Sequence, residues 1–249
     1  MNFYQTPVAL NRERHRNLKL DPSLGNYLFA AQTNSLLLAT TELIDAAASY
    51  PVVFVGEAGG PYTLCAMVGL NNEENLFVDA KGSWDAGSYV PAFVRRYPFV
   101  LSGGADENGD LAVCIDESFP GFNEQNGQPL FDAQGKETPL LQGAIEFLQH
   151  FHAEMLHTTD FAQRLSALGL LTPRSFEVQR DGQKRVVEGV VVIDAEKLSA
   201  LDDATVLTMV RSGDMALAHA HLLSIKQVPH LAVRLEERLK NAADATGTR

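Results

Sequence analysis

The sequence predicts an α+β fold: a small, mostly antiparallel sheet in the N-terminal half packs against several helices, and the C-terminal part is helical. Residues 1–137 hold short runs of β-branched and aromatic residues bounded by Gly, Pro and Asn, a pattern typical of strands and turns. Residues 138–249 mostly repeat apolar residues at helical spacing. Strands and helices do not alternate regularly, as they would in a doubly wound fold. We therefore expect one domain, 1–249, with a subdivision between residues 137 and 138.

Turn-forming residues divide the N-terminal half into short elements. Apolar residues at helical spacing predict a helix over 36–50, which Pro51 ends. Pro91 suits the first turn of a short helix through Arg96, because proline lacks the N–H group that a helix start leaves unpaired. Residues 118–137 are loop-like, with a hairpin between two glycine turns. The predicted strands are 52–55, 63–70, 76–78, 99–101 and 111–115, the last two paired with each other.

The C-terminal part begins with clear helix signals. Thr138 is a good N-cap and Pro139 a good first residue, so a helix is predicted to start there, and a second helix to start near Thr159. Asp181-Gly182 is a strong hairpin signal between two runs rich in β-branched residues. Further on, Gly213 and Pro229 are expected to separate helices at 203–211, 213–224 and 228–241, with a frayed C-terminal end.

Charge and hydropathy argue against two classes of partner. The formal net charge is −11, whereas a protein that holds nucleic acid needs a positive face to displace phosphate counterions. We therefore expect neither nucleic acid nor an anionic membrane surface as a partner. No secretory signal and no run of about 18 apolar residues is visible, which predicts no membrane insertion and a cytoplasmic location, with export by a route without a cleaved signal left open. One basic cluster near the start forms either a local patch or a solvated arm; it comprises Arg12, Arg14, His15 and Arg16.

The sequence contains no complete metal or nucleophile motif. Cys65 and Cys114 lie in apolar runs, which predicts buried free thiols, with a disulfide as the alternative if their strands are neighbours. The segment 106–110 is similar to a calcium loop, but its glycine is misplaced, which favours a tight turn. Two histidine pairs, two residues apart on predicted helices, face different sides and are expected to be partly exposed; they are His150 with His152 and His219 with His221. We expect no metal and no cofactor.

The segment 75–101 combines the only tryptophan with tyrosines and a pair of arginines. Aromatic faces beside guanidinium groups suit sugars, aromatic acids or carboxylates. Neighbouring helical residues point about 100° apart, so Arg95 and Arg96 are not expected to clamp one ligand together. The alternative is that one arginine pairs with Asp79 or Asp85 and fixes the loop. The candidate ligand-binding residues are Asp79, Trp84, Tyr89, Arg95, Arg96 and Tyr97.

Blocks of residues spread over almost the whole chain match one known family. In the first half they are Phe29-Ala30-Ala31 with Asn34, Glu42, 50–54, 75–79, Gly82, Trp84, 89–92 and 95–99. In the second half they are Leu130-Phe131, Phe147-Leu148, Asp181-Gly182, Asp194 and Leu222-Leu223-Ser224. Together these blocks resemble the SapC family of bacterial proteins, which is named for a surface-layer-associated protein. The resemblance implies surface-layer association and genes beside flavin-dependent halogenase-like proteins and outer-membrane receptors, but it implies no catalytic residues.

Two hypotheses from different classes follow. The first is a non-enzymatic binding or assembly protein, which self-associates or binds another protein. The family name implies surface-layer association, but the missing export signal favours a cytoplasmic role over that of a lattice subunit. The second is an accessory enzyme, or a carrier of a small aromatic or sugar-like ligand, acting beside halogenase-like partners. Its acid–base chemistry would have to come from loop carboxylates such as Asp79, Asp85, Asp116 and Glu117. The lack of a complete catalytic constellation favours the first hypothesis.

Overall fold

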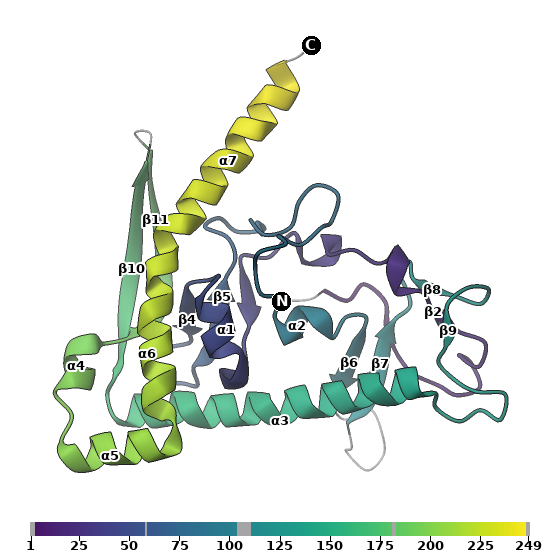
Figure 1. Cartoon of the computed structure of the whole chain (residues 1–249), viewed down its shortest axis with the longest axis horizontal. Coiled ribbons are helices and arrows are strands. Elements are labelled where there is room, and N and C mark those ends of the chain that lie inside the picture. Colours follow the sequence, from purple (N-terminus) through teal and green to yellow (C-terminus); the bar gives the residue numbers. More distant parts are fainter. Residues whose placement is uncertain (1–2, 58, 104–110, 181–182, 248–249) are drawn as a thin grey trace.

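The computed structural model has the predicted α+β fold. It describes residues 3–57, 59–103, 111–180 and 183–247. The calcium-like segment 106–110 and the Asp181-Gly182 turn lie outside the described residues. Figure 1 shows the largest sheet toward one end, smaller sheets toward the other, and a long helix, α3, running below them. No helix in the described ranges is both long and apolar enough to cross a bilayer.

The largest sheet has five antiparallel strands in the order β10-β11-β4-β5-β3. Its central strands are apolar runs with mostly buried side chains, which suits strands covered on both faces. The predicted C-terminal hairpin is confirmed as the pair β10 and β11. The bounds are β3 Ser35–Leu37, β4 Val52–Val55, β5 Thr63–Met67, β10 Leu171–Arg180 and β11 Gln183–Ile193.

Two three-stranded sheets complete the described β structure. One has the order β1-β7-β6, and its β6–β7 pair confirms the predicted pairing of the strands near 99–101 and 111–115. The other, with the order β8-β2-β9, pairs β2 of the N-terminal segment with two short strands of the loop-like segment 118–137. The bounds are β1 Pro7–Ala9, β2 Lys19–Leu20, β6 Phe99–Ser102, β7 Ala112–Asp116, β8 Phe122–Asn123 and β9 Gln128–Pro129.

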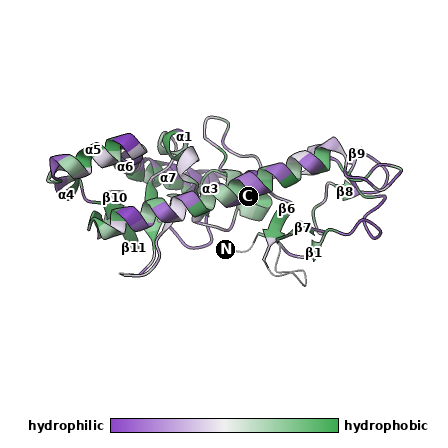
Figure 2. Cartoon of the chain, turned by 90° about the horizontal axis from the view of Figure 1, so that it is seen from below, coloured by the Kyte–Doolittle hydropathy of each residue, from purple (hydrophilic) through white to green (hydrophobic). Residues whose placement is uncertain are grey.

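Helix α3, Pro139–Ala167, joins the two ends of the molecule. Thr138 caps it by accepting a hydrogen bond from the N–H of Leu141. The predicted break near Thr159 is wrong, because α3 continues through it. The Thr158 and Thr159 hydroxyls donate to carbonyl oxygens four residues earlier, at 2.7 and 3.0 Å, so the helix accommodates both β-branched residues. Seen from below, α3 runs from the β8–β9 end toward the α4–α5 end (Figure 2).

The C-terminal helices follow the predicted order. Gly213 has a φ of 84°, a left-handed conformation that favours glycine, and it separates α5 from α6. Pro229 lies in the first turn of α7, which continues to Gly247 and projects past the sheet in Figure 1. The helices not yet given are α1 Leu43–Ala47, α2 Ala92–Arg95, α4 Ala195–Ser199, α5 Asp203–Ser212, α6 Asp214–Ser224 and α7 Val228–Gly247.

Two predicted elements are corrected. The segment 36–50 is a helix only at its end, in α1, because its first residues form the edge strand β3. Leu36 and Leu38 are buried while Leu37 is only partly so, and this period of two matches pairing with β5. The segment 76–78 is not a ladder strand. There the side chain of Asn75 accepts the N–H of Phe77 at 2.9 Å, and only Val78 forms a single bridge, to Trp84.

The buried apolar residues form two clusters. The larger surrounds the five-stranded sheet and includes Phe54, Phe161 and Trp84. The smaller packs β6, β7 and the loop-rich segment against the start of α3, and includes Phe119 and Leu148. Tyr97 packs against both clusters. The junction between the two clusters therefore lies at the end of α2.

The cysteines and the basic cluster have structural roles. Cys65 and Cys114 are buried and free, as predicted, and lie in different sheets. Burial raises the pKa of the Cys65 thiol to about 12. The basic cluster is not a solvated arm: Arg14 and the buried ring of His15 contact Glu117 at 2.8 and 3.0 Å. These contacts fix the N-terminal segment beside β7.

His221 departs from the expectation that the histidines are partly exposed. It faces inward from α6, is fully buried, and its ring centroid lies 5.4 Å from that of Phe54. Neither ring nitrogen has a hydrogen-bond partner in the described part of the chain. Burial lowers the pKa of His221 from 6.5 to about 4, so the ring is neutral near pH 7.

We expect His221 to make folding acid-sensitive. Its pKa is lower in the folded than in the unfolded chain, so the unfolded chain takes up the proton first as the pH falls from 6.5 to 4. Over that interval His221→Leu should lose less free energy of unfolding than the wild type, by about 3 kcal/mol. Urea unfolding at a series of pH values measures the difference. The control, His219→Leu, changes an exposed histidine of the same helix and should keep the wild-type dependence.

Candidate ligand-binding site

A pocket of about 520 Å³ lies where the two clusters meet, between the end of α2, the first turns of α3 and the segment 20–29. We call it the aromatic pocket, because its walls include the rings of Tyr27, Phe29, Tyr97, Phe119 and Phe147. The rings of Phe29 and Tyr97 are stacked with their centroids 3.9 Å apart. The ring of Phe119 meets that of Tyr97 edge-on at 5.5 Å. The contacts between these rings give the pocket a preformed flat wall.

The charged residues that line the aromatic pocket are all positive in the part of the chain that the structure describes. Among the described residues that line it, Arg95 and Arg96 are charged and none is acidic. The chain as a whole has a net charge of −11. A positively charged lining in an acidic protein favours an anionic ligand over a cationic one.

Arg95 lies at the rim with its side chain 46% exposed. Its Nε donates to the carbonyl oxygen of Val90 at 3.0 Å, and its Nη2 donates to the hydroxyl of Tyr89 at 3.1 Å. The guanidinium carbon lies 5.4 Å from the ring centroid of Phe147. The nearest carboxylate oxygen, on Glu42, is 3.7 Å away. Arg95 is thus oriented by two neutral oxygens, an aromatic ring and a long ion pair with Glu42, and its Nη1 has no hydrogen-bond partner in the described ranges.

Arg96 points elsewhere, in agreement with the angle between neighbouring helical residues. Its guanidinium carbon lies 4.2 Å from the ring centroid of Phe93, 5.4 Å from that of Phe151 and 5.9 Å from that of Tyr4. Its Nε is buried without a hydrogen-bond partner among the described residues. Burial lowers the pKa of Arg96, although the group remains a cation at neutral pH. Arg96 is therefore held mainly by aromatic faces.

Glu42 is the residue that sequence reasoning missed as part of this region. Its buried carboxylate accepts hydrogen bonds from the N–H of Ala92 at 2.6 Å, the hydroxyl of Tyr89 at 2.8 Å and the N–H of Ala39 at 3.2 Å. Burial and the neighbouring Glu42 raise the pKa of Tyr89 to about 12. The sequence did contain a sign of this role: Glu42 is an acidic residue inside an apolar run, and a carboxylate that is buried there needs hydrogen-bond donors.

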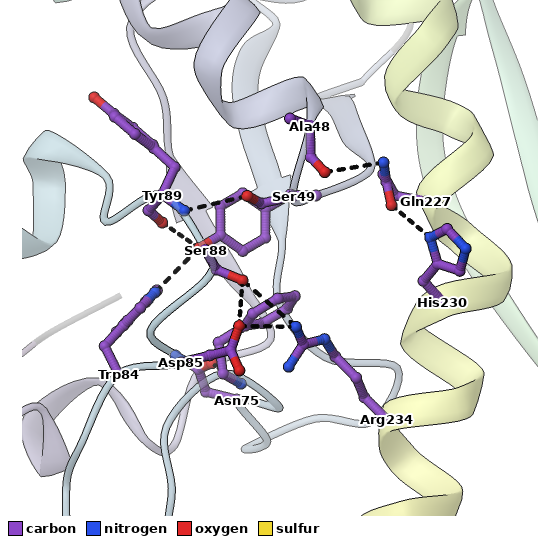
Figure 3. A network of polar contacts seen from close by, with 12 residues as sticks. Ala48, Ser49, Asn75, Trp84, Asp85, Ser88, Tyr89, Gln227, His230 and Arg234 are labelled. Carbon is purple, nitrogen blue, oxygen red and sulfur yellow. Dashed lines mark hydrogen bonds and ion pairs between the residues drawn. The ribbon is translucent and has the colours of Figure 1, made fainter.

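Trp84 belongs to the core. It is 8% exposed, its Nε1 donates to the hydroxyl of Tyr50 at 3.2 Å, and Tyr50 in turn donates to the carbonyl oxygen of Tyr89 (Figure 3). Its ring meets that of Tyr27 edge-on at 5.5 Å. Neither Trp84 nor Tyr89 lines the aromatic pocket, and both support the segment that precedes α2.

Asp79 is exposed and shapes a turn. Its carboxylate accepts the N–H groups of Ser83 and Lys81, each at 2.8 Å, and these bonds lower the pKa of Asp79. The structure does not bring it to the aromatic pocket. The six candidate residues thus divide: Arg95, Arg96 and Tyr97 line the pocket, while Asp79, Trp84 and Tyr89 do not.

The alternative pairing of Arg95 or Arg96 with Asp79 or Asp85 does not occur. Asp85 instead accepts a hydrogen bond from Arg234 of α7 at 2.9 Å (Figure 3). The guanidinium carbon of Arg234 also lies 4.2 Å from the ring centroid of Phe77. Helix α7 therefore fixes the loop around Asp85. Because Arg234 and Asp85 are far apart in the sequence, no local pattern predicted their pairing.

The remaining carboxylates named as acid–base candidates are occupied. Burial alone would raise the pKa of Asp116, but hydrogen bonds from Ser118 and from the N–H groups of Gln5 and Thr6 outweigh it and lower the pKa to about 2. Glu117 is held by Arg14 and His15. Neither carboxylate lines the aromatic pocket. Within the described ranges, no three His, Cys, Asp or Glu side chains gather as a metal ion would require.

Comparison with known families gives one match. The model of the SapC family matches residues 10–231. The chain belongs to the SapC family. The matched range contains every described residue that lines the aromatic pocket, so the pocket is part of the SapC region of this protein. No curated protein and no solved structure matches the chain.

We expect Glu42 to be a main support of this SapC-family site. Glu42→Ala leaves the N–H of Ala92 and the hydroxyl of Tyr89 without their buried acceptor, which should lower the free energy of unfolding by about 2–4 kcal/mol. Urea unfolding followed by circular dichroism measures this loss. Glu42→Gln, which keeps an acceptor oxygen, should lose less, and Asp45→Ala on the exposed face of α1 should lose almost nothing. An equal loss in Glu42→Ala and Asp45→Ala would contradict the assignment.

Proposed function

We propose that this SapC-family protein is a non-enzymatic binding protein whose aromatic pocket takes a small aromatic carboxylic acid. One observation carries the proposal: the pocket combines aromatic walls with a half-exposed arginine at its rim, Arg95, and has no acidic residue among its described lining. Ligand pockets of about 300–1,000 Å³ are typical for small molecules, and about 520 Å³ suits a ligand of one or two rings.

The two parts of such a ligand match two parts of the pocket. A flat ring would pack against Tyr97, Phe119 and Phe147, where edge-on and offset contacts are favourable. The carboxylate would reach Arg95 at the rim, whose guanidinium is already oriented by Tyr89 and Val90. Preorganisation of this kind lowers the entropy cost of binding.

Gly143 on α3 leaves space for the ligand. It lines the pocket, and a Cβ placed on it would meet no atom within 4 Å. Glycine inside a helix is unfavourable by about 1 kcal/mol relative to alanine. A glycine at this position is therefore better explained by the open space over the pocket than by the stability of the helix.

The lining supports binding rather than catalysis. The polar side chains among the described lining residues are those of Asn26, Tyr27, Tyr97, Arg95 and Arg96, and none is a carboxylate, imidazole, thiol or amine. Burial, followed by the charge of Asp116, raises the pKa of Tyr97 to about 12, and its hydroxyl donates to Asp116 at 3.2 Å. A general base for proton transfer near neutral pH is therefore missing from the described lining.

The binding partner of this protein and the compartment in which it acts remain predictions. Self-association, binding of another protein and surface-layer association all rest on the family resemblance, and so does a carrier role beside halogenase-like partners. A carrier would use the same aromatic pocket and differ only in passing its ligand on.

Calorimetric titration with 4-hydroxybenzoate tests the proposal. Arg95→Met keeps the length of the side chain but removes its charge, and we expect it to weaken binding about 10- to 100-fold, as for the loss of a charge-assisted hydrogen bond. The neutral 4-hydroxybenzamide should bind the wild type as weakly as 4-hydroxybenzoate binds the Arg95→Met variant. Arg174→Met, which changes an exposed arginine outside the pocket, should leave the affinity unchanged.

Gly143→Leu provides an independent test, because it places a bulky side chain over the pocket without losing a native contact. We expect it to abolish binding of 4-hydroxybenzoate and to preserve or raise the melting temperature. Gly143→Ala should retain most of the affinity. Equal binding of the acid and the amide, together with normal binding by Gly143→Leu, would disprove the aromatic pocket as the site.

A further inference from the structure

A second hollow of about 550 Å³ adjoins the aromatic pocket. We call it the polar hollow, because its described lining includes the side chains of Lys81, Ser83, Asp85 and Ser88. The residues 25–27 line both hollows. The ring of Tyr27 lies between the two, 5.5 Å from the ring centroid of Trp84 and 6.3 Å from that of Phe29.

The wall shared by the two hollows is rigidly built. The N–H of Tyr27 donates to the carbonyl oxygen of Gly82 at 2.8 Å. Gly82 has a φ of 83°, and a Cβ placed on it would lie 2.8 Å from the side chain of Asn26. Only glycine allows this close approach of the two segments. Arg95 adds a second link, because it lines the aromatic pocket and donates to Val90, which lines the polar hollow.

The two hollows differ in chemistry. In the polar hollow, the Lys81 ammonium and the Ser83 hydroxyl make no hydrogen bond to the part of the chain that the structure describes, and Asp85 keeps one carboxylate oxygen outside its bonds to Arg234 and Ser88. Hydroxyl, amine and carboxylate groups beside aromatic rings suit a ligand group with several hydroxyls. The aromatic pocket offers no comparable set.

We infer that the natural ligand has two parts: an aromatic acid in the aromatic pocket, joined to a hydroxyl-rich group such as a sugar, which occupies the polar hollow. This inference rests on the proposed function, since it assigns the second half of the same ligand. The link between the two parts passes Tyr27, the residue that both hollows share.

Calorimetry with 4-hydroxybenzoate and its 4-O-β-glucoside tests the inference. The wild type should bind the glucoside about tenfold more tightly than the free acid. The double variant Lys81→Ala/Ser83→Ala should lose this advantage and bind the free acid as the wild type does. Arg95→Met should weaken both ligands by the same factor. Lys136→Ala, an exposed lysine outside both hollows, is the matched control.

The outcomes separate this inference from the proposed function. Binding of the free acid with no gain for the glucoside overturns the two-part ligand and leaves the aromatic pocket standing. An advantage of the glucoside that survives in the double variant also overturns it, because the polar hollow then does not hold the sugar. Failure of both ligands to bind overturns the two proposals together.

Discussion

The buried carboxylate of Glu42 is the constraint that places the site. A charge without water must be satisfied by hydrogen bonds, and Glu42 finds its donors in the N–H of Ala92 and the hydroxyl of Tyr89. These bonds tie the edge of the large sheet to the start of α2, a helix too short to hold its own position. The residues that follow, Arg95, Arg96 and Tyr97, are therefore placed by a group far earlier in the chain. The aromatic pocket exists because this attachment leaves Tyr97 between two apolar clusters that do not merge.

Helix α3 keeps the two clusters together and also leaves the gap between them open. Its buried residues include Leu148 of the smaller cluster and Phe161 of the larger one. Beside the pocket α3 carries Gly143, where a Cβ atom would meet no other atom within 4 Å. Glycine there forgoes about 1 kcal/mol of helix propensity relative to alanine, which supports the proposal that the open space beside the pocket is used by a ligand.

The local elements were predictable where the sequence had one interpretation. Runs such as 52–55 could only be strands, and the Thr138-Pro139 start of α3 was clear. The spacing of apolar residues gave the wrong element at 36–50, because the first apolar residues there suit an edge strand as well as a helix. It also gave a wrong helix break near Thr159, because the hydroxyls of Thr158 and Thr159 donate hydrogen bonds to carbonyl oxygens of the same helix. Within the candidate site, the arginines and Tyr97 could be chosen from their chemistry. The core position of Trp84 and the attachment of Asp85 by Arg234 could not, because both depend on residues far apart in sequence.

The neighbouring arginines show how a step of one helical residue gives two side chains different surroundings. Arg96 is surrounded by the rings of Tyr4, Phe93 and Phe151, and cation–π attraction offsets part of its desolvation without a carboxylate. Arg95, about 100° away around the helix, keeps almost half of its side chain in solvent and is held by neutral oxygens and, at 3.7 Å, by Glu42. In a protein of net charge −11, long-range attraction does not draw an anion to this rim. The proposed selection of an acid would therefore come from short-range contacts, and Nη1 of Arg95 is the group available to make them among the described residues.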